Sequence, residues 1–175
     1  MNFFGEIDNI VLKEYDGSYP KKYFAEIELL EQTFSSLNPE FHHIGSTAIP
    51  NILSKPVIDI AVEVNPFPLD EDKLEMLYEL GYVYWALNPD KNHQFFFKNL
   101  PRTHHLHVYP RGADKLKKEI VFRDLLIQSK ELKNEYELLK KDLASKFSTD
   151  REKYTEMKTE FIQLTLERNT NPNKI

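Results

Sequence analysis

The chain has 175 residues, no cysteine and a formal net charge of −5. Without cysteine it can form neither a disulfide bond nor a thiolate zinc site. The negative charge excludes a global cationic field that would attract nucleic acid, although a small anionic ligand could still bind in a local basic pocket. The first ten residues lack the pattern of a signal peptide, and no apolar run reaches the ~20 residues of a membrane helix. We therefore expect a cytoplasmic protein without nucleic-acid or membrane partners.

The first half of the chain shows alternating helix and strand patterns. The predicted elements are a helix over 20–37, a strand over 41–44, a loop over 46–56, a strand over 57–64 and a helix over 70–81. The last of these has Asp70 at its N-cap and ends at Gly81. In the second strand, the even-numbered residues are all Ile or Val and share one face, which leaves Asp59, Ala61 and Glu63 on the other.

The second half has aromatic-rich strands followed by helices. We predict strands over 82–87, 93–99 and 104–110, and helices from Ala113 onward. One helix has an apolar stripe made of Leu132, Tyr136, Leu139, Leu143 and Phe147. Thr149 with Glu152 predicts a capping box for a last helix, and residues 169–175 are expected to be a frayed tail. This order favours an α+β fold with a mixed sheet, flanking helices and a helical C-terminal third, in one domain over 1–175 with a core of 11–168.

The Gly45-Ser46 turn after the first strand is a candidate phosphate site. A residue without Cβ lets a phosphate approach the backbone, and the N–H groups and the Ser46 hydroxyl are donors. A plain turn would explain the same two residues. Asp59 is the second candidate, because a carboxylate in an apolar strand must be solvated, paired or bound to a metal. The strand offers one metal carboxylate rather than two, since position 61 is alanine and Glu63 lies ~13 Å away.

Three histidines in the segment THHLHV are candidate metal ligands. His105 and His107 share a strand face, and His104 takes the opposite one. Imidazole pairs suit a transition metal better than magnesium, although packing or hydrogen bonding would also explain them. His43 precedes the glycine turn by two residues and is a further candidate ligand.

Several basic residues flank these elements. Lys55, Arg102, Arg111 and Arg123 could neutralise phosphate charge or could simply be solvated. Tyr154 and Lys158 share a helix face at a spacing of four residues. Simple packing, with the lysine amine reaching solvent, would explain this pair.

Four segments together resemble the GrpB family: HIGSTAIPNILSKPVIDIAV, HHLHVYPRG, FRDLL and YTEMKTEFI. The resemblance covers residues 11–166 and implies a nucleotidyltransferase-like fold, related to a domain fused to dephospho-CoA kinase in some bacteria. Carried over by motif, it implies that Gly45 and Ser46, with Thr47 beside them, hold phosphates, and that Asp59 is the first metal carboxylate. The second acidic position falls at Ala61, and the third falls near His105 or His107.

The resulting expectation is a site for a small phosphorylated or nucleotide-type ligand, with a divalent ion (manganese, zinc or magnesium) and no organic cofactor. Asp59 and His107 are the candidate catalytic residues, with His105 and His43 as further metal ligands. Lys55 and Arg111, with the Gly45–Thr47 turn, are expected to bind phosphate. Metal-dependent nucleotidyl transfer is one interpretation. The alternative is a non-catalytic binding or accessory module, for example for a coenzyme A biosynthetic kinase.

Overall fold

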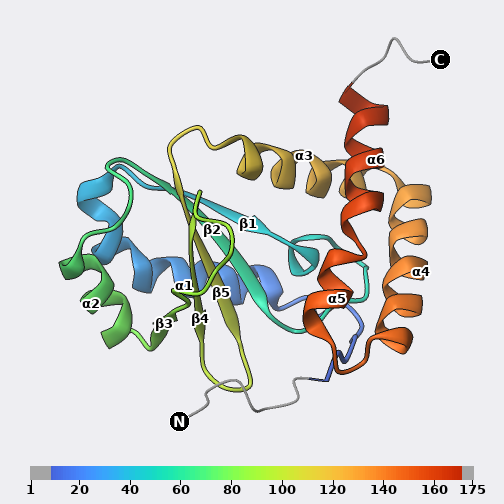
Figure 1. Cartoon of the computed structure of the whole chain (residues 1–175), viewed down its shortest axis with the longest axis horizontal. Helices are drawn as coiled ribbons and strands as arrows, with labels where there is room; N and C mark the ends of the chain where they lie inside the picture. Colours follow the sequence, from blue (N-terminus) through green and yellow to red (C-terminus); the bar gives the residue numbers. More distant parts are fainter. Residues whose placement is uncertain (1–8, 171–175) are drawn as a thin grey trace.

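The computed structural model describes residues 9–170 and contains a five-stranded mixed sheet with helices on both faces (Figure 1). The strands are β1 (Glu40–Ile44), β2 (Ile58–Val64), β3 (Tyr82–Tyr84), β4 (Gln94–Lys98) and β5 (His104–Pro110). Their order in the sheet is β1-β2-β5-β4-β3. Only β2 and β5 pair in parallel, while the other neighbours are antiparallel. The predicted α+β fold with a mixed sheet is confirmed.

The helices form two groups. They are α1 (Tyr19–Phe34), α2 (Glu71–Glu79), α3 (Asp114–Gln128), α4 (Lys130–Lys146), α5 (Arg151–Glu156) and α6 (Thr159–Thr170), with short 3₁₀ turns η1 (Ser35–Leu37) and η2 (Ser46–Ala48). Helices α1 and α2 pack on one face of the sheet and α3 on the other. Helices α4 to α6 stand together at one end of the sheet, beside the loop that joins β1 to β2 (Figure 1).

Strand β2 is buried on both faces. Its even-numbered residues lie in the main core under α1 and α2, as predicted. The odd-numbered face, which carries Asp59, Ala61 and Glu63, is also covered. Ala61 is fully buried and packs against Leu116 of α3, and Glu63 is buried and accepts a hydrogen bond from the Gly112 N–H at 2.7 Å. An interior strand paired in parallel is typically covered on both sides by helices.

Several predicted boundaries differ from the structure. The strand predicted over 82–87 ends at Tyr84. The last helix is divided into α5 and α6, and its N-cap is Asp150 rather than Thr149, because the Asp150 carboxylate accepts from the Lys153 N–H at 2.9 Å. Residues 169 and 170 are helical rather than frayed. The rest of the predicted tail, 171–175, lies outside the described residues.

The predicted apolar stripe of α4 holds the loop between β1 and β2. Tyr136, Leu132 and Leu139 pack in one cluster with Ile49 and Ile52 of that loop. The C-terminal helices therefore fix the segment that follows Gly45. Within residues 9–170, no helix has the length and apolarity needed to cross a membrane.

Candidate functional site

Gly45 brings the β1–β2 loop directly against Asp59. The two strands are antiparallel, and Ile44 is the register partner of Asp59. Gly45 has φ 69°, and a Cβ at this position would overlap the Asp59 carboxylate. Position 45 therefore needs glycine for two reasons: its backbone is in a left-handed region, and the carboxylate fills the space of a side chain. The pairing of β1 with β2 thus places the glycine turn against Asp59.

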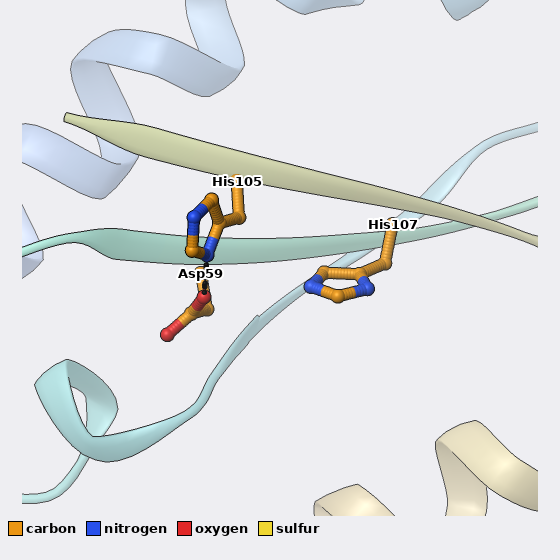
Figure 2. A group of neighbouring side chains, drawn as sticks. All are labelled: Asp59, His105 and His107. Carbon is orange, nitrogen blue, oxygen red and sulfur yellow. Dashed lines mark hydrogen bonds and ion pairs between the residues drawn. The ribbon is translucent and has the colours of Figure 1, made fainter. Parts of the chain in front are cut away.

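Asp59 is held by His105, its register partner on β5 (Figure 2). The His105 Nδ1 and the Asp59 Oδ1 are 2.7 Å apart, and the Asp59 side chain is 25% exposed. Burial is the largest single influence and acts to raise the pKa of Asp59, but the hydrogen bond and charge of His105, together with the charges of His107 and Lys55, lower the pKa to about 2. Asp59 is thus a carboxylate at neutral pH. The other His105 nitrogen, Nε2, lies 3.0 Å from Nη2 of Arg151 at the start of α5.

His107 lies beside this pair on the same strand face, with one ring nitrogen directed toward it (Figure 2). Burial lowers the pKa of His107 to about 3, so the ring is neutral. Its Nδ1 atom is buried and has no hydrogen-bond partner in the described structure. One potential ligand atom from each of Asp59, His105 and His107 lies within 4.8 Å of the others. A carboxylate and neutral imidazoles at this spacing are a suitable donor set for a transition metal.

Two lysine amines of the C-terminal segment lie near this site: Lys140 is buried against the glycine turn, and Lys158, between α5 and α6, is half-buried and close enough to Asp59 to interact with its charge. Lys140 of α4 is 1% exposed, and its Nζ donates to Ser46 Oγ at 3.3 Å and to the carbonyl of Leu53. Burial, with the charge of Lys158, lowers the pKa of Lys140 to about 7. Burial also lowers the pKa of Lys158 to about 8, although Asp59 acts in the opposite direction. For both amines, the attraction of nearby carboxylates does not compensate for the effect of burial.

Tyr154 of α5 links Lys158 to one of the predicted phosphate-binding residues. The Nζ atoms of Lys55 and Lys158 lie 5.7 and 4.4 Å from the centroid of the Tyr154 ring. Lys55 also contributes to the low pKa of Asp59. The structure therefore brings Lys55 to the same end of the sheet as the Gly45–Ser46 turn. The sequence-based interpretation of Tyr154 and Lys158 as a packing pair described their contact but not their neighbours.

Lys140 and Arg151 were missed in the sequence, although Lys140 left a signal. It follows Tyr136 by four residues, so it lies on the apolar face of α4, where a cation is unfavourable without a partner. Arg151 left no comparable signal, because its contact with His105 joins segments 46 residues apart.

A third missed residue is Glu119 of α3, which accepts hydrogen bonds from the Tyr109 hydroxyl at 3.3 Å. Burial raises the pKa of Glu119 to about 7. The Tyr109 ring stacks on His93 at 4.9 Å, and His93 in turn stacks on His107 at 5.4 Å. Stacked aromatic rings therefore connect Glu119 to His107 through Tyr109 and His93.

Three predicted site residues are placed elsewhere. Thr47 is buried, and its hydroxyl donates to the Val57 carbonyl at 3.2 Å while contacting His43 Nε2 at 3.1 Å. His43 points to the opposite sheet face from Asp59 and stacks on Tyr23 of α1 at 4.7 Å. Both residues therefore support the loop rather than line the site.

Arg111 lies at the far end of β5, six residues or ~20 Å along the strand from His105. There it pairs with Glu40 at 2.8 Å and with Glu63 at 3.7 Å. Glu40, Glu63 and His42 also form a three-residue group with metal-ligand spacing. Arg111 already neutralises its carboxylates, so this second group is explained as an ion-pair cluster.

The fold defines the class of protein. The structure is similar to that of Cid1 in complex with the UTP analog UMPNPP, with a TM-score of 0.51 and 15% identity, over 75% of this chain and 42% of that chain. At this identity the likeness shows the fold alone. The sheet with its flanking helices is a nucleotidyltransferase-like α+β fold.

Closer similarities then define the family. The model of the GrpB protein family matches residues 9–168, so the chain belongs to the GrpB family. The crystal structure of the conserved protein GrpB from Enterococcus faecalis matches with a TM-score of 0.77 and 27% identity, over 90% of this chain and 96% of that one.

Two relatives show the same membership in sequence. The glutamate-rich protein GrpB of Alkalihalophilus pseudofirmus is 34% identical over 160 residues, which cover 87% of this chain and 91% of the relative. The UPF0157 protein PA4798 of Pseudomonas aeruginosa is 34% identical over 161 residues, which cover 89% of this chain. The match spans 65% of the Pseudomonas protein, slightly less than two thirds of its length.

Proposed function

We propose that this chain binds a phosphorylated, nucleotide-type ligand between the Gly45–Ser46 turn and the cations of α4 to α6, with one divalent ion at Asp59. The observation that carries this proposal is the contact of the buried Lys140 with the turn, beside a half-buried Lys158 whose charge interacts with Asp59. Lys140 contacts Ser46, and the pKa values of Lys140 and Lys158 are lowered to about 7 and 8. Phosphate oxygens would supply the negative charge that these amines lack.

The ion-binding part of the proposal is supported by the donor set. Asp59 is ionised, and the neutral His107 directs one ring nitrogen toward it (Figure 2). A carboxylate with imidazole suits manganese or zinc better than magnesium. A bound ion would neutralise phosphate charge and polarise a phosphoryl oxygen. Ser46 and Lys140 would orient the phosphates, and Lys55 and Lys158 would offset the charge that develops on them.

Ala61 favours a second candidate function, a non-catalytic binding or accessory module. In-line transfer commonly uses two ions to stabilise the attacking and leaving oxygens. The strand has no second carboxylate two residues from Asp59, because position 61 is an alanine covered by Leu116 of α3. We therefore expect the chain to bind its ligand with little turnover, and we expect any nucleotidyl transfer to depend on a single ion.

Thermal unfolding of the full chain tests binding. We expect ATP or UTP with Mn²⁺, at about 100 times the Kd, to stabilise the protein by about 2.7 kcal/mol and to raise its Tm by roughly 5–10 °C. Ser46→Ala and Lys158→Met should reduce this shift. Lys146→Met is the matched control, because Lys146 is exposed and pairs with Asp142 on the outer face of α4. Equal shifts in all variants, or no shift with any nucleotide, would contradict the proposal.

Turnover separates the two candidate functions. Release of pyrophosphate from each nucleoside triphosphate is measured with Mg²⁺, Mn²⁺ or Zn²⁺ in the wild type, Asp59→Asn and His107→Ala. Metal-dependent release that both variants lose supports an enzyme. A nucleotide-induced rise in Tm without release under any condition supports the binding module.

A further inference from the structure

We infer that Arg151 and His105 are positioning residues that orient Asp59, which leaves Asp59 and His107 as the protein ligands of the proposed ion. This inference rests on the proposed function for the identity of the ion site. It differs from the sequence-based expectation, in which His105 was a metal ligand. The difference follows from two hydrogen bonds and from the chemistry of their donors.

The first step concerns the contact between Arg151 and His105. A guanidinium group has only N–H donors, so at 3.0 Å the Nε2 atom of His105 must accept. An accepting Nε2 carries no proton. The neutral ring therefore carries its proton on Nδ1, because a neutral imidazole has one donor and one acceptor nitrogen.

The second step concerns Asp59. A protonated Nδ1 can donate to a carboxylate, and Nδ1 of His105 lies 2.7 Å from Oδ1 of Asp59. Both nitrogens of His105 are then engaged. The lone pair on Nε2 accepts from Arg151 and is not available to a metal ion. His107 differs, since one of its ring nitrogens is directed toward Asp59 and His105 (Figure 2). The second oxygen of Asp59 points away from His105 (Figure 2).

The third step concerns what holds this chain of contacts in place. Arg151 is the first residue of α5, and the side chain of Asp150 caps that helix. His105 is fixed by register opposite Asp59, and the Phe95 ring lies against it at 5.2 Å in an edge arrangement. The position of α5 is thereby coupled to the orientation of the Asp59 carboxylate. Partners of this kind fix the tautomer of a histidine and the geometry of a metal ligand.

The test is a measurement of imidazole tautomers by long-range ¹H–¹⁵N correlation in the ¹⁵N-labelled full chain, with Zn²⁺ alone as the probe. In the wild type we expect His105 to carry its proton on Nδ1, before and after Zn²⁺ is added. Zn²⁺ should shift a ring nitrogen of His107 but should not convert a nitrogen of His105 into a metal ligand. A proton on His105 Nε2, or zinc ligation by His105, would overturn the inference.

Variants separate positioning from a merely structural role. In Arg151→Met we expect a mixture of His105 tautomers and a zinc affinity about tenfold or more below that of the wild type, with partial recovery of both in Arg151→Lys. Arg168→Met, on the exposed last turn of α6, is the control and should change neither. An unchanged tautomer and an unchanged zinc affinity in Arg151→Met would also overturn the inference.

The outcomes for the two proposals can be distinguished. If neither nucleotide nor Zn²⁺ binds the wild type, the proposed function fails. The link between Arg151 and His105 would still be supported by an Nδ1-protonated His105 that becomes a mixture in Arg151→Met. If nucleotide binds but His105 ligates zinc, the proposed function stands and the positioning inference fails.

Discussion

Lys140 is a cation on the buried face of α4, and we expect it to lower the stability of the folded protein. Burial lowers the pKa of Lys140 from 10.5 to about 7. Between these values the unfolded chain binds more protons than the folded one, so the wild type gains stability as the pH rises above about 7. At lower pH both states are protonated and the full penalty applies. Under the proposed function, the bound ligand would offset this loss of stability.

The prediction is that Lys140→Met is more stable than the wild type at pH 6 and that this advantage shrinks above pH 7, by up to ~1.4 kcal/mol per pH unit. Urea denaturation between pH 6 and pH 9 measures it. Lys146→Met, on the exposed face, should follow the wild type. A constant difference across this pH range would contradict the lowered pKa of Lys140.

Gly45 permits a second prediction at the residue scale. Gly45→Ala should destabilise the protein by ~3 kcal/mol or more, because it combines backbone strain with a collision against Asp59. Gly112 also has a positive φ, of 79°, but the space around it is open, so Gly112→Ala should show only the strain of about 1–2 kcal/mol. Chemical denaturation compares the two. Equal losses would mean that the Asp59 carboxylate does not require the glycine.

At the scale of elements, α5 depends on its cap. Asp150→Ala removes the acceptor of the Lys153 N–H and should lower stability by about 1 kcal/mol. Thr149→Ala should have little effect, although Thr149 with Glu152 matches the capping-box pattern. Thermal unfolding of both variants decides between the two residues. A larger loss in Thr149→Ala would show that the sequence pattern was the better guide.

The elements were largely predictable because they follow from local periodicity. The alternation in β2 and the stripe on α4 are visible within single segments, and both lie where expected. The placement of His43 and Arg111 was not predictable, since it depends on which residues become neighbours across the sheet. His43 faces away from Asp59 because the register pairs Ile44 with Asp59, and this register cannot be seen in either strand alone.

At the scale of the whole molecule, the sheet and α3 determine which site residues are accessible. The sequence pointed to the turn, Asp59, His105 and His107 as candidate residues, because they lie in two short motifs around β2 and on β5. It did not show that α3 covers Ala61, nor that α4 and α5 supply Lys140 and Arg151. These contacts depend on the packing of distant helices.

The cover over Ala61 predicts that the missing acid cannot simply be restored. Ala61→Asp would bury a charge under Leu116 and should destabilise the protein by at least ~3 kcal/mol without adding an ion. Ala86→Asp, at an exposed position, is the control for the added charge. Denaturation and Mn²⁺ stoichiometry by calorimetry measure the two effects. A stable Ala61→Asp protein that binds one more ion would contradict this account.

The distance along the chain between the two halves of the site has a consequence for synthesis. Ser46 and Lys140 touch across 94 residues of sequence. The turn and Asp59 leave the ribosome long before the helices that carry the cations, because translation proceeds at about 5–20 residues per second. For several seconds the nascent chain holds Asp59 and Lys55 without the cations of the C-terminal segment. If the proposed function holds, binding of the anionic ligand should therefore begin only after α4 and α5 have packed against the turn, so that ligand binding would report the completion of folding.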